Sequence, residues 1–195
     1  MSERDTTLLS GERQVHDNFK GIEYWHKWRY LQALPYVINN TVLDVGCGCG
    51  YGSMILSIFA SHVIGVDDSQ EAIEFARKHW QRANLNYIHT DFLDKFVVPT
   101  IQVITIFDVI EHIEDTDAVF AKLREFHLEK IILSVPHTQA PIGDNQFHHR
   151  HYSAEELVRR FHAIGYKPLR LEFRYFDRDM KSRNNLNIYS VWERF

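Results

Sequence analysis

Cysteine is scarce in this sequence, and a long apolar run is missing. The 195 residues include two cysteines, Cys47 and Cys49, which are too few for a disulfide framework or a structural zinc site. This scarcity predicts a reducing, cytoplasmic location. No apolar stretch approaches the roughly 20 residues of a membrane span, and the start of the chain is polar and acidic rather than signal-like. We therefore expect no membrane span.

A strong excess of basic charge is also missing. Lys and Arg number 22 and Asp and Glu number 26, which gives a formal net charge of -4. An affinity that comes mainly from neutralising phosphates needs a basic surface, so nucleic acid is not the expected partner. Residues 150–183 differ, with nine basic and five acidic side chains. Such a stretch is usually a solvated face, and the alternative is contact with an anionic substrate.

The chain length and the order of the apolar segments predict one α/β domain. Short β-branched runs alternate with helical patterns, which is typical of a parallel sheet covered on both faces. The last two runs, 167–176 and 185–195, alternate in polarity and are joined by a polar loop. The expected fold is a doubly wound, mostly parallel, seven-stranded Rossmann-like sheet with an antiparallel C-terminal edge hairpin. The other expected strands begin at Thr41 or cover residues 62–68, 86–92, 101–110 and 130–136, and the expected helices cover residues 50–60, 69–83, 115–127 and 153–166.

The N-terminal part differs in composition from the rest. Residues 1–40 are expected to form an arm and a lid helix, and residues 41–195 the catalytic domain. The helical stretch covers residues 21–37, and we expect it to break near Pro35. The alternative to a lid is an ordinary amphipathic helix that packs on the sheet. The lid side chains would be the aromatic ones, Tyr24, Trp25, Trp28 and Tyr30.

The first expected strand ends in a glycine-rich loop, Gly46 to Gly52. Its spacing does not fit G-x-G-x-x-G, because the sixth residue counted from Gly46 is Tyr51. The loop also lacks the Gly-Lys-Ser/Thr end of a P-loop. The pattern therefore disfavours NAD and a P-loop nucleotide site, although glycines still allow a ligand to approach the backbone closely.

The sequence DVGCGCG, residues 44–50, resembles the acid-x-Gly-x-Gly-x-Gly motif of class I S-adenosylmethionine-dependent methyltransferases. The resemblance continues through GVDDS, HTDF, FDVIEHIED and SVPH. It implies S-adenosylmethionine as the cofactor, with Asp67 as acceptor for both ribose hydroxyls and Asp91 as partner of the adenine amino group. The cofactor-binding residues that the resemblance implies are Asp44, Gly46, Gly48, Gly50, Asp67, Asp91 and Asp108.

The candidate catalytic residues are Glu111, His112 and His148. An alcohol acceptor loses a proton during methyl transfer, so a base or a metal is useful. Asp108, Glu111 and His112 have i, i+3, i+4 spacing, which gathers them on one side of a helical turn. With a histidine from 148–151 they could bind Mg2+ or Mn2+, as in the similar ubiquinone-pathway O-methyltransferases and small-RNA 2'-O-methyltransferases. The alternative is that the site holds no metal, as in relatives with the same V-I-E-H sequence, where the glutamate and the histidine cap a helix or line the pocket.

His148 is preferred among the histidines because the stretch from Asn145 to Ser153 resembles the substrate-side loop of methyltransferases encoded beside glycosyltransferases. Those proteins also carry a G-E-R followed by an H-x-x-R-Y helix. The matching residues here are Gly11, Glu12, Arg13, His26, Arg29 and Tyr30. Adjacent side chains on an extended backbone alternate sides, so at most two members of the run His148–His151 are expected to share a site.

The expected function is methylation of a hydroxyl on a small molecule, a sugar or a lipid-linked glycan. A metal-assisted RNA 2'-O-methyltransferase is the alternative that would use the basic stretch 150–183. A third alternative is a non-catalytic, cofactor-binding partner subunit, because motifs establish binding and not chemistry.

Overall fold

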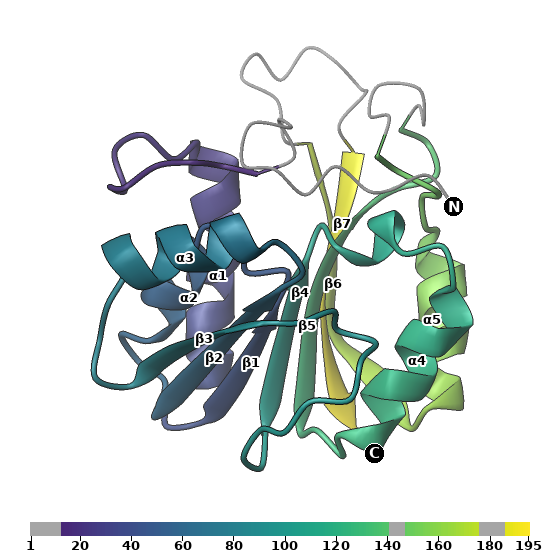
Figure 1. The fold of residues 1–195 in the computed structure, drawn as a ribbon. Coiled ribbons are helices and arrows are strands. Elements are labelled where there is room, and N and C mark those ends of the chain that lie inside the picture. The colour runs from purple at the N-terminus through teal and green to yellow at the C-terminus, as the bar shows by residue number, and fades with distance from the viewer. Residues whose placement is uncertain (1–12, 141–146, 176–185) are drawn as a thin grey trace. The chain divides into compact units, whose positions relative to one another are not determined.

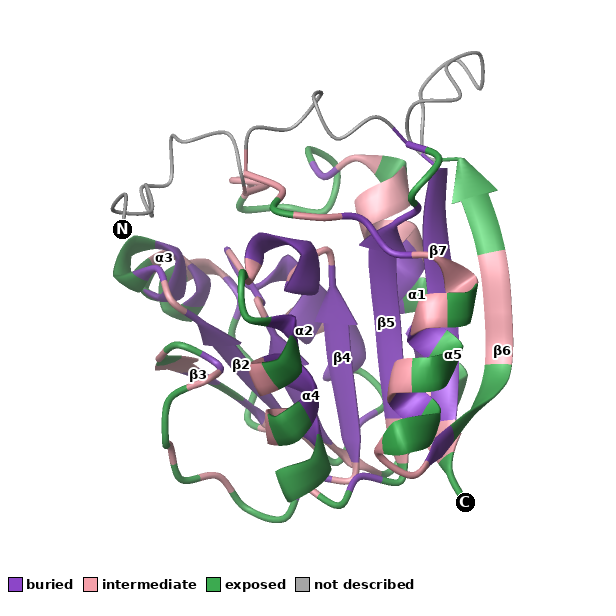
Figure 2. Cartoon of the chain, turned by 90° about the vertical axis from the view of Figure 1, so that its right-hand side faces the viewer, coloured by how far each residue is buried: buried purple, intermediate pink, exposed green. Residues whose placement is uncertain are grey.

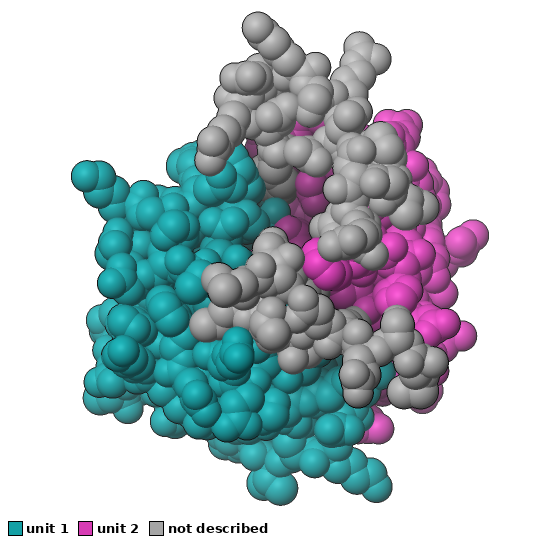
Figure 3. Space-filling model, turned by 45° about the horizontal axis from the view of Figure 1, so that its top comes forward, with its two compact units in different colours: residues 1–101 teal, residues 102–195 magenta. Residues whose placement is uncertain are grey.

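The computed structural model describes residues 13–140, 147–175 and 186–195. The chain forms two compact units, residues 1–101 and 102–195, which Figure 3 distinguishes by colour. Each unit has its own strands and helices (Figure 1). Among the helices of the described ranges, none combines the length and the apolar character that crossing a membrane requires.

The first unit contains a three-stranded parallel sheet in the order β3-β2-β1. Val42 pairs with Val63, and Val63 pairs with Leu85, which sets the register across the three strands. The central strand is almost wholly buried, as expected for a parallel strand covered by helices. The elements of this unit are α1 (Tyr24–Val37), β1 (Thr41–Val45), α2 (Tyr51–Leu56), β2 (His62–Asp67), α3 (Gln70–His79) and β3 (Leu85–His89).

The helices of the first unit begin and end for local reasons. The hydroxyl of Ser69 accepts a hydrogen bond from the N–H of Ala72 and caps α3, at the residue where the expected helix 69–83 begins. The expected break of α1 near Pro35 is wrong: the helix continues to Val37. A proline this close to the helix end removes only one backbone hydrogen bond near the terminus, so the remaining turn survives. Tyr30 of α1 is buried and packs edge-on against Tyr51 of α2.

The second unit contains a four-stranded part in the order β4-β5-β7-β6. β4 and β5 are parallel, whereas β7 runs antiparallel to both β5 and β6. Figure 2 shows β5 and β7 buried and β6 exposed along most of its length, as an edge strand should be. The elements of this unit are β4 (Val103–Phe107), η1 (Ile110–His112), α4 (Thr116–Glu125), β5 (Lys130–Pro136), α5 (Ala154–Ala163), β6 (Tyr166–Tyr175) and β7 (Leu186–Arg194).

Aromatic packing holds the helices of the second unit to its strands. Phe161 of α5 stacks on Trp192 of β7 at 4.2 Å between ring centroids and meets Phe120 of α4 edge-on at 5.1 Å. The hydroxyl of Ser153 accepts the N–H of Glu156 and caps α5, at the residue where the expected helix 153–166 begins. The fold-class prediction is confirmed: the described residues form seven strands, mostly parallel, with an antiparallel pair at the C-terminal edge.

Candidate active site

The glycine-rich loop of the first unit lies between β1 and α2. Gly46, Gly48 and Gly50 have φ angles of 66°, 52° and 89°, a region that side-chain-bearing residues rarely adopt. Space also requires glycine at position 50, because a Cβ there would lie 2.6 Å from the Cβ of Ala76 and 2.7 Å from the hydroxyl of Tyr87. That hydroxyl donates to the carbonyl of Gly50 at 3.0 Å and fixes the end of the loop.

Asp67, at the end of β2, faces this loop. Its carboxylate is 6% exposed and accepts the N–H of Gly48 at 2.8 Å through Oδ2 and the N–H of Ser69 at 3.0 Å through Oδ1. Arg13 donates to the same Oδ1 from Nη2 at 3.0 Å and to Asp68 at 2.9 Å. A paired-oxygen acceptor therefore lies beside backbone glycines, the combination that a vicinal diol requires.

The other two predicted acids of the first unit have different surroundings. Asp44 is fully buried in β1, and its Oδ2 accepts a hydrogen bond from the hydroxyl of Ser53 at 2.6 Å. Asp91 is exposed after β3, where its Oδ1 accepts the N–H of Leu93 at 2.8 Å in a tight turn. Ser53 was not among the predicted residues, and its i+9 spacing from Asp44 gives no sequence signal.

The two cysteines of the chain lie inside the glycine-rich loop. Both are buried, with exposed fractions of 2% for Cys47 and 1% for Cys49. Burial, followed by the negative charge of Asp67, raises the pKa of the Cys47 thiol well above its usual value and that of Cys49 to about 12. Both side chains are therefore neutral thiols that fill space in the loop.

In the second unit, Asp108 follows β4 in a left-handed backbone conformation with a φ of 54°. Such a conformation is costly for a residue other than glycine and is often found at functional sites. The carboxylate of Asp108 accepts a hydrogen bond from the hydroxyl of Ser134 at 2.8 Å, and the N–H of Asp108 donates to the carbonyl of Ser134 at 3.0 Å. The spacing predicts that Asp108 and Glu111 lie on one helical turn. This prediction is wrong, because the turn begins two residues after Asp108, at Ile110.

Glu111, His112 and His148 lie together in the second unit. A carboxylate oxygen and one ring nitrogen from each histidine lie within 4.8 Å of one another. Glu111 is fully buried and His112 is 9% exposed. The ring centroids of His112 and His148 are 4.9 Å apart. The structure thus brings together the three residues that the sequence predicts as catalytic, although Asp108 is not in this cluster.

His148 is held in its neutral form. Burial, followed by the neighbouring His112 and His151, lowers the pKa of His148 to about 4, while Asp108 opposes this shift. An imidazole with this pKa is neutral at pH 7, and its unprotonated nitrogen can accept a proton. A general base needs such an unprotonated nitrogen within hydrogen-bond reach of the proton that it removes.

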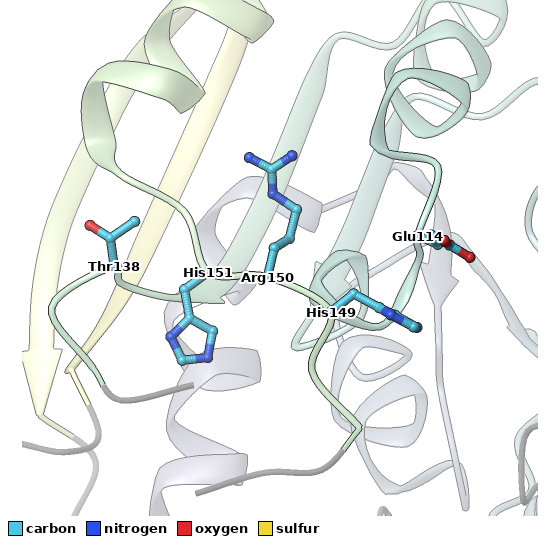
Figure 4. A pocket seen from close by; sticks show the side chains of 5 residues that line it. All are labelled: Glu114, Thr138, His149, Arg150 and His151. Atoms are coloured by element: carbon cyan, nitrogen blue, oxygen red, sulfur yellow. The ribbon is translucent and has the colours of Figure 1, made fainter. Parts of the chain in front are cut away.

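The histidine run does not alternate as an extended strand would. Residues 147–150 form a turn and bend, so His148 pairs with His151, three positions away, at 2.9 Å between ring nitrogens. His149 is exposed, and its N–H donates to the carbonyl of Glu111 at 2.9 Å. Figure 4 shows Arg150 and His151 pointing to opposite sides of the chain. The pocket drawn there has a volume of about 490 Å³ and is lined by Glu114, Thr138, His149, Arg150 and His151.

These observations decide which ligands the residues fit. The loop glycines and the Asp67 carboxylate fit a ligand with a diol, and S-adenosylmethionine has one in its ribose. The Glu111, His112 and His148 donor set fits a divalent cation of borderline character, because it mixes one carboxylate with two imidazoles. Of the resembling N-terminal motif, Gly11 and Glu12 lie outside the described residues, while Arg13 contacts Asp67.

Comparisons with known proteins agree with this assignment. A family model described as a methyltransferase domain matches residues 38–163. A probable S-adenosylmethionine-dependent methyltransferase of Mycobacterium tuberculosis is 33% identical over 166 residues. That alignment covers 77% of this chain, and the chain spans 58% of the length of the mycobacterial protein.

Solved structures share the fold. A putative S-adenosylmethionine-dependent methyltransferase from Listeria monocytogenes superposes with a TM-score of 0.71 at 17% identity, covering 88% of this chain and 97% of that one. An N-methyltransferase from Bradyrhizobium japonicum, in complex with S-adenosyl-L-homocysteine, gives a TM-score of 0.74 at 12% identity over 92% and 93% of the two chains. At these identities the likeness concerns the fold alone.

Proposed function

Because this chain belongs to the class I S-adenosylmethionine-dependent methyltransferases, we propose that it methylates a hydroxyl group of a small molecule, a sugar or a lipid-linked glycan. The observation that carries this proposal is the half-buried His148, with its lowered pKa, beside Glu111 and His112. A hydroxyl acceptor loses a proton as the new bond forms, whereas an amine that arrives neutral needs less help. A neutral histidine in a cluster with a buried carboxylate supplies the acceptor for that proton.

The first unit would hold the cofactor. Asp67 would accept hydrogen bonds from the ribose hydroxyls, and the backbone of Gly46, Gly48 and Gly50 would allow close approach of the amino-acid portion. When bound, S-adenosylmethionine supplies a methyl group already activated by its positive sulfur. The protein then has to position and desolvate the acceptor, an effect that can supply about 7–11 kcal/mol of the barrier in well-oriented reactions.

The second unit would handle the proton. His148 would take the hydroxyl proton, and the negative charge of Asp108, which already opposes the lowering of the His148 pKa, would stabilise the imidazolium that results. A general base of this kind typically accelerates a reaction by about 10²- to 10⁴-fold.

A metal-assisted RNA 2'-O-methyltransferase is the second candidate, because the three-ligand cluster suits a divalent cation. Glu111, His112 and His148 would hold the metal, which would supply positive charge beside a hydroxyl oxygen. Of the seven arginines in the basic stretch that RNA binding would use, five lie in the part of the chain that the structure describes, and four of these five form ion pairs within the second unit. Arg150 and Arg160 pair with Glu156, Arg160 also pairs with Asp117, and Arg170 and Arg174 pair with Glu172. This pairing favours the small-molecule or glycan acceptor.

A transfer assay with tritiated S-adenosylmethionine tests the proposal. The acceptors are glycans, phenols and RNA, each with and without EDTA, and mass spectrometry locates the methyl group. We expect label on a hydroxyl of a glycan or phenol, and His148→Gln should lower kcat by about 10²-fold or more. His162→Gln, an exposed histidine of α5, is the matched control.

Three outcomes would contradict the proposal. Label found only on nitrogen would show that the acceptor is an amine. Label on RNA that disappears with EDTA would favour the second candidate. Tight binding of S-adenosylhomocysteine with no transfer to any acceptor would favour a non-catalytic partner subunit.

A further inference from the structure

We infer that His151 is a positioning residue that sets the tautomer of His148, so that Nδ1 of His148 carries the proton and Nε2 is the nitrogen that accepts one. The catalytic consequence of this inference depends on the proposed function, in which His148 takes the acceptor proton. The tautomer itself does not, because it follows from hydrogen bonds within the second unit.

With one proton on each imidazole ring, the hydrogen bonds leave one consistent arrangement of protons. Nδ1 of His151 lies 3.0 Å from the carbonyl oxygen of Ala140 in a buried contact. A carbonyl can only accept, so the proton of His151 is on Nδ1, and Nε2 of the neutral ring is an acceptor. Nδ1 of His148 lies 2.9 Å from that Nε2 and must therefore be the donor. In neutral His148 the acceptor nitrogen is then Nε2.

His151 can act in this way because its own position is fixed. Its side chain is 7% exposed, and the next residue, Tyr152, is fully buried. The N–H of Tyr152 donates to the carbonyl of Pro136 at 2.9 Å, and the carbonyl of Tyr152 accepts the N–H of Thr138 at 3.0 Å. These two bonds attach the histidine segment to the end of β5.

The carbonyl that directs His151 is fixed as well. The N–H of Ala140 donates to the carbonyl of His137 at 2.8 Å, which closes a turn directly after β5. The hydrogen-bonded series therefore runs from the strand end through this turn to His151, and from His151 to His148. Because each link is anchored to the backbone, it specifies both the proton position and the orientation of the His148 ring.

His112 has an independent arrangement of the same kind. Its Nδ1 lies 3.0 Å from the carbonyl oxygen of Phe147 and must donate to it, so the acceptor nitrogen of neutral His112 is also Nε2. Phe147 is the residue directly before His148. The same loop therefore sets the proton position in both imidazoles of the cluster, one through a backbone carbonyl and the other through His151.

Two substitutions separate the tautomer effect from simple packing. His151→Phe keeps an aromatic ring of similar shape and removes the acceptor nitrogen. His151→Gln places an amide near the position of Nε2 and can still accept from Nδ1 of His148. His162→Gln is the control, because His162 is an exposed histidine of α5 in the same unit and lies outside the cluster and the pocket.

The readout is the two-bond proton–nitrogen NMR spectrum of the folded, ¹⁵N-labelled protein near pH 7, with His148 assigned by the signals missing from His148→Gln. In the wild type we expect His148 to show a protonated Nδ1 and an unprotonated Nε2. His151→Phe should move His148 toward a mixture of tautomers and lower kcat at least about tenfold, with the dissociation constant of S-adenosylhomocysteine within about twofold. His151→Gln should restore most of the wild-type tautomer and rate.

A wild-type spectrum in which Nε2 of His148 is protonated would overturn the inference. So would a His148 tautomer that His151→Phe leaves unchanged, or an equal loss of rate in the Phe and Gln variants. If His151→Phe does not fold, the wild-type spectrum and the Gln variant still decide the question. Failure of the wild type to methylate any hydroxyl would refute the proposed function, while the spectrum would continue to judge the tautomer.

Discussion

Replacement of Asp67 by Asn should weaken cofactor binding by about 1.5–3 kcal/mol, the worth of hydrogen bonds to a charged group. The side chain is 5% exposed, so water screens its charge poorly. Asn keeps the size of Asp and one carbonyl oxygen, but its amide cannot accept from the second ribose hydroxyl. At about 1.4 kcal/mol for each factor of ten, the dissociation constant should rise about 10- to 150-fold.

Isothermal titration calorimetry with S-adenosylhomocysteine measures this change directly. Asp68→Asn is the matched control, because Asp68 contacts the same Arg13 but its side chain is 28% exposed. We expect Asp68→Asn to change the dissociation constant less than about threefold, in line with the small worth of exposed ion pairs. Circular dichroism should show both variants folded, since each retains the shape of the wild-type side chain.

Binding by folded Asp67→Asn within twofold of the wild type would refute the reasoning. It would mean that the carboxylate serves only the three donors that already contact it, which are the N–H groups of Gly48 and Ser69 and the guanidinium of Arg13. Asp67 would then organise the glycine-rich loop without contacting the ribose.

Three other perturbations test the rest of the molecule. Gly50→Ala should lower the free energy of unfolding, measured by urea titration, by about 2–5 kcal/mol, because the new side chain adds left-handed strain and overpacking. Gly165→Ala should lower it by only about 1–2 kcal/mol, because no atom lies within 4 Å of the added Cβ. Equal losses in the two variants would contradict the steric argument. The pKa of about 4 for His148, lowered from 6.5 mainly by burial, keeps the ring neutral as pH falls, so turnover should stay level from pH 8 to about 5.5 and decline only near pH 4. A half-maximal rate near pH 6.5 would exclude His148 as the titrating base. Glu111→Gln should lower kcat about 10²-fold without changing cofactor affinity, and EDTA should leave wild-type turnover unchanged if the site works without a metal; EDTA inhibition reversed by Mn2+ would favour the metal-assisted alternative.

Local sequence patterns predicted the first unit well, because its features depend on short stretches of chain. The left-handed glycine backbone after β1 is a local feature, although the contact of Asp67 with Gly48 joins residues 19 positions apart. The cap of α3 at Ser69 is also local, as is the cap of α5 at Ser153 in the second unit. The break expected at Pro35 failed because position within the helix, which the sequence does not mark, decides how much a proline costs.

The second unit depends more on contacts between distant residues. The pairing of His148 with His151 needs a turn that ordinary strand periodicity does not describe. The left-handed backbone at Asp108 has no compositional signal, since Asp is not glycine. The basic stretch was expected to be a solvated face, with contact to an anionic substrate as the alternative, and Arg160 of this stretch pairs with Asp117, 43 positions away. Such pairings arise only once the chain is folded, so charge counts along the sequence overestimate the available positive charge.

The position of Cys47 and Cys49 gives the glycine-rich loop its own chemical reporter. They are the two cysteines of the chain, and both are buried neutral thiols, so a thiol reagent can react with them only while the loop is open. The rate of labelling, compared with that of the unfolded chain, therefore measures the free energy of loop opening without an added probe. A ligand that binds the closed loop must slow this reaction in proportion to its occupancy, which converts alkylation kinetics into a binding isotherm for S-adenosylmethionine and its analogues.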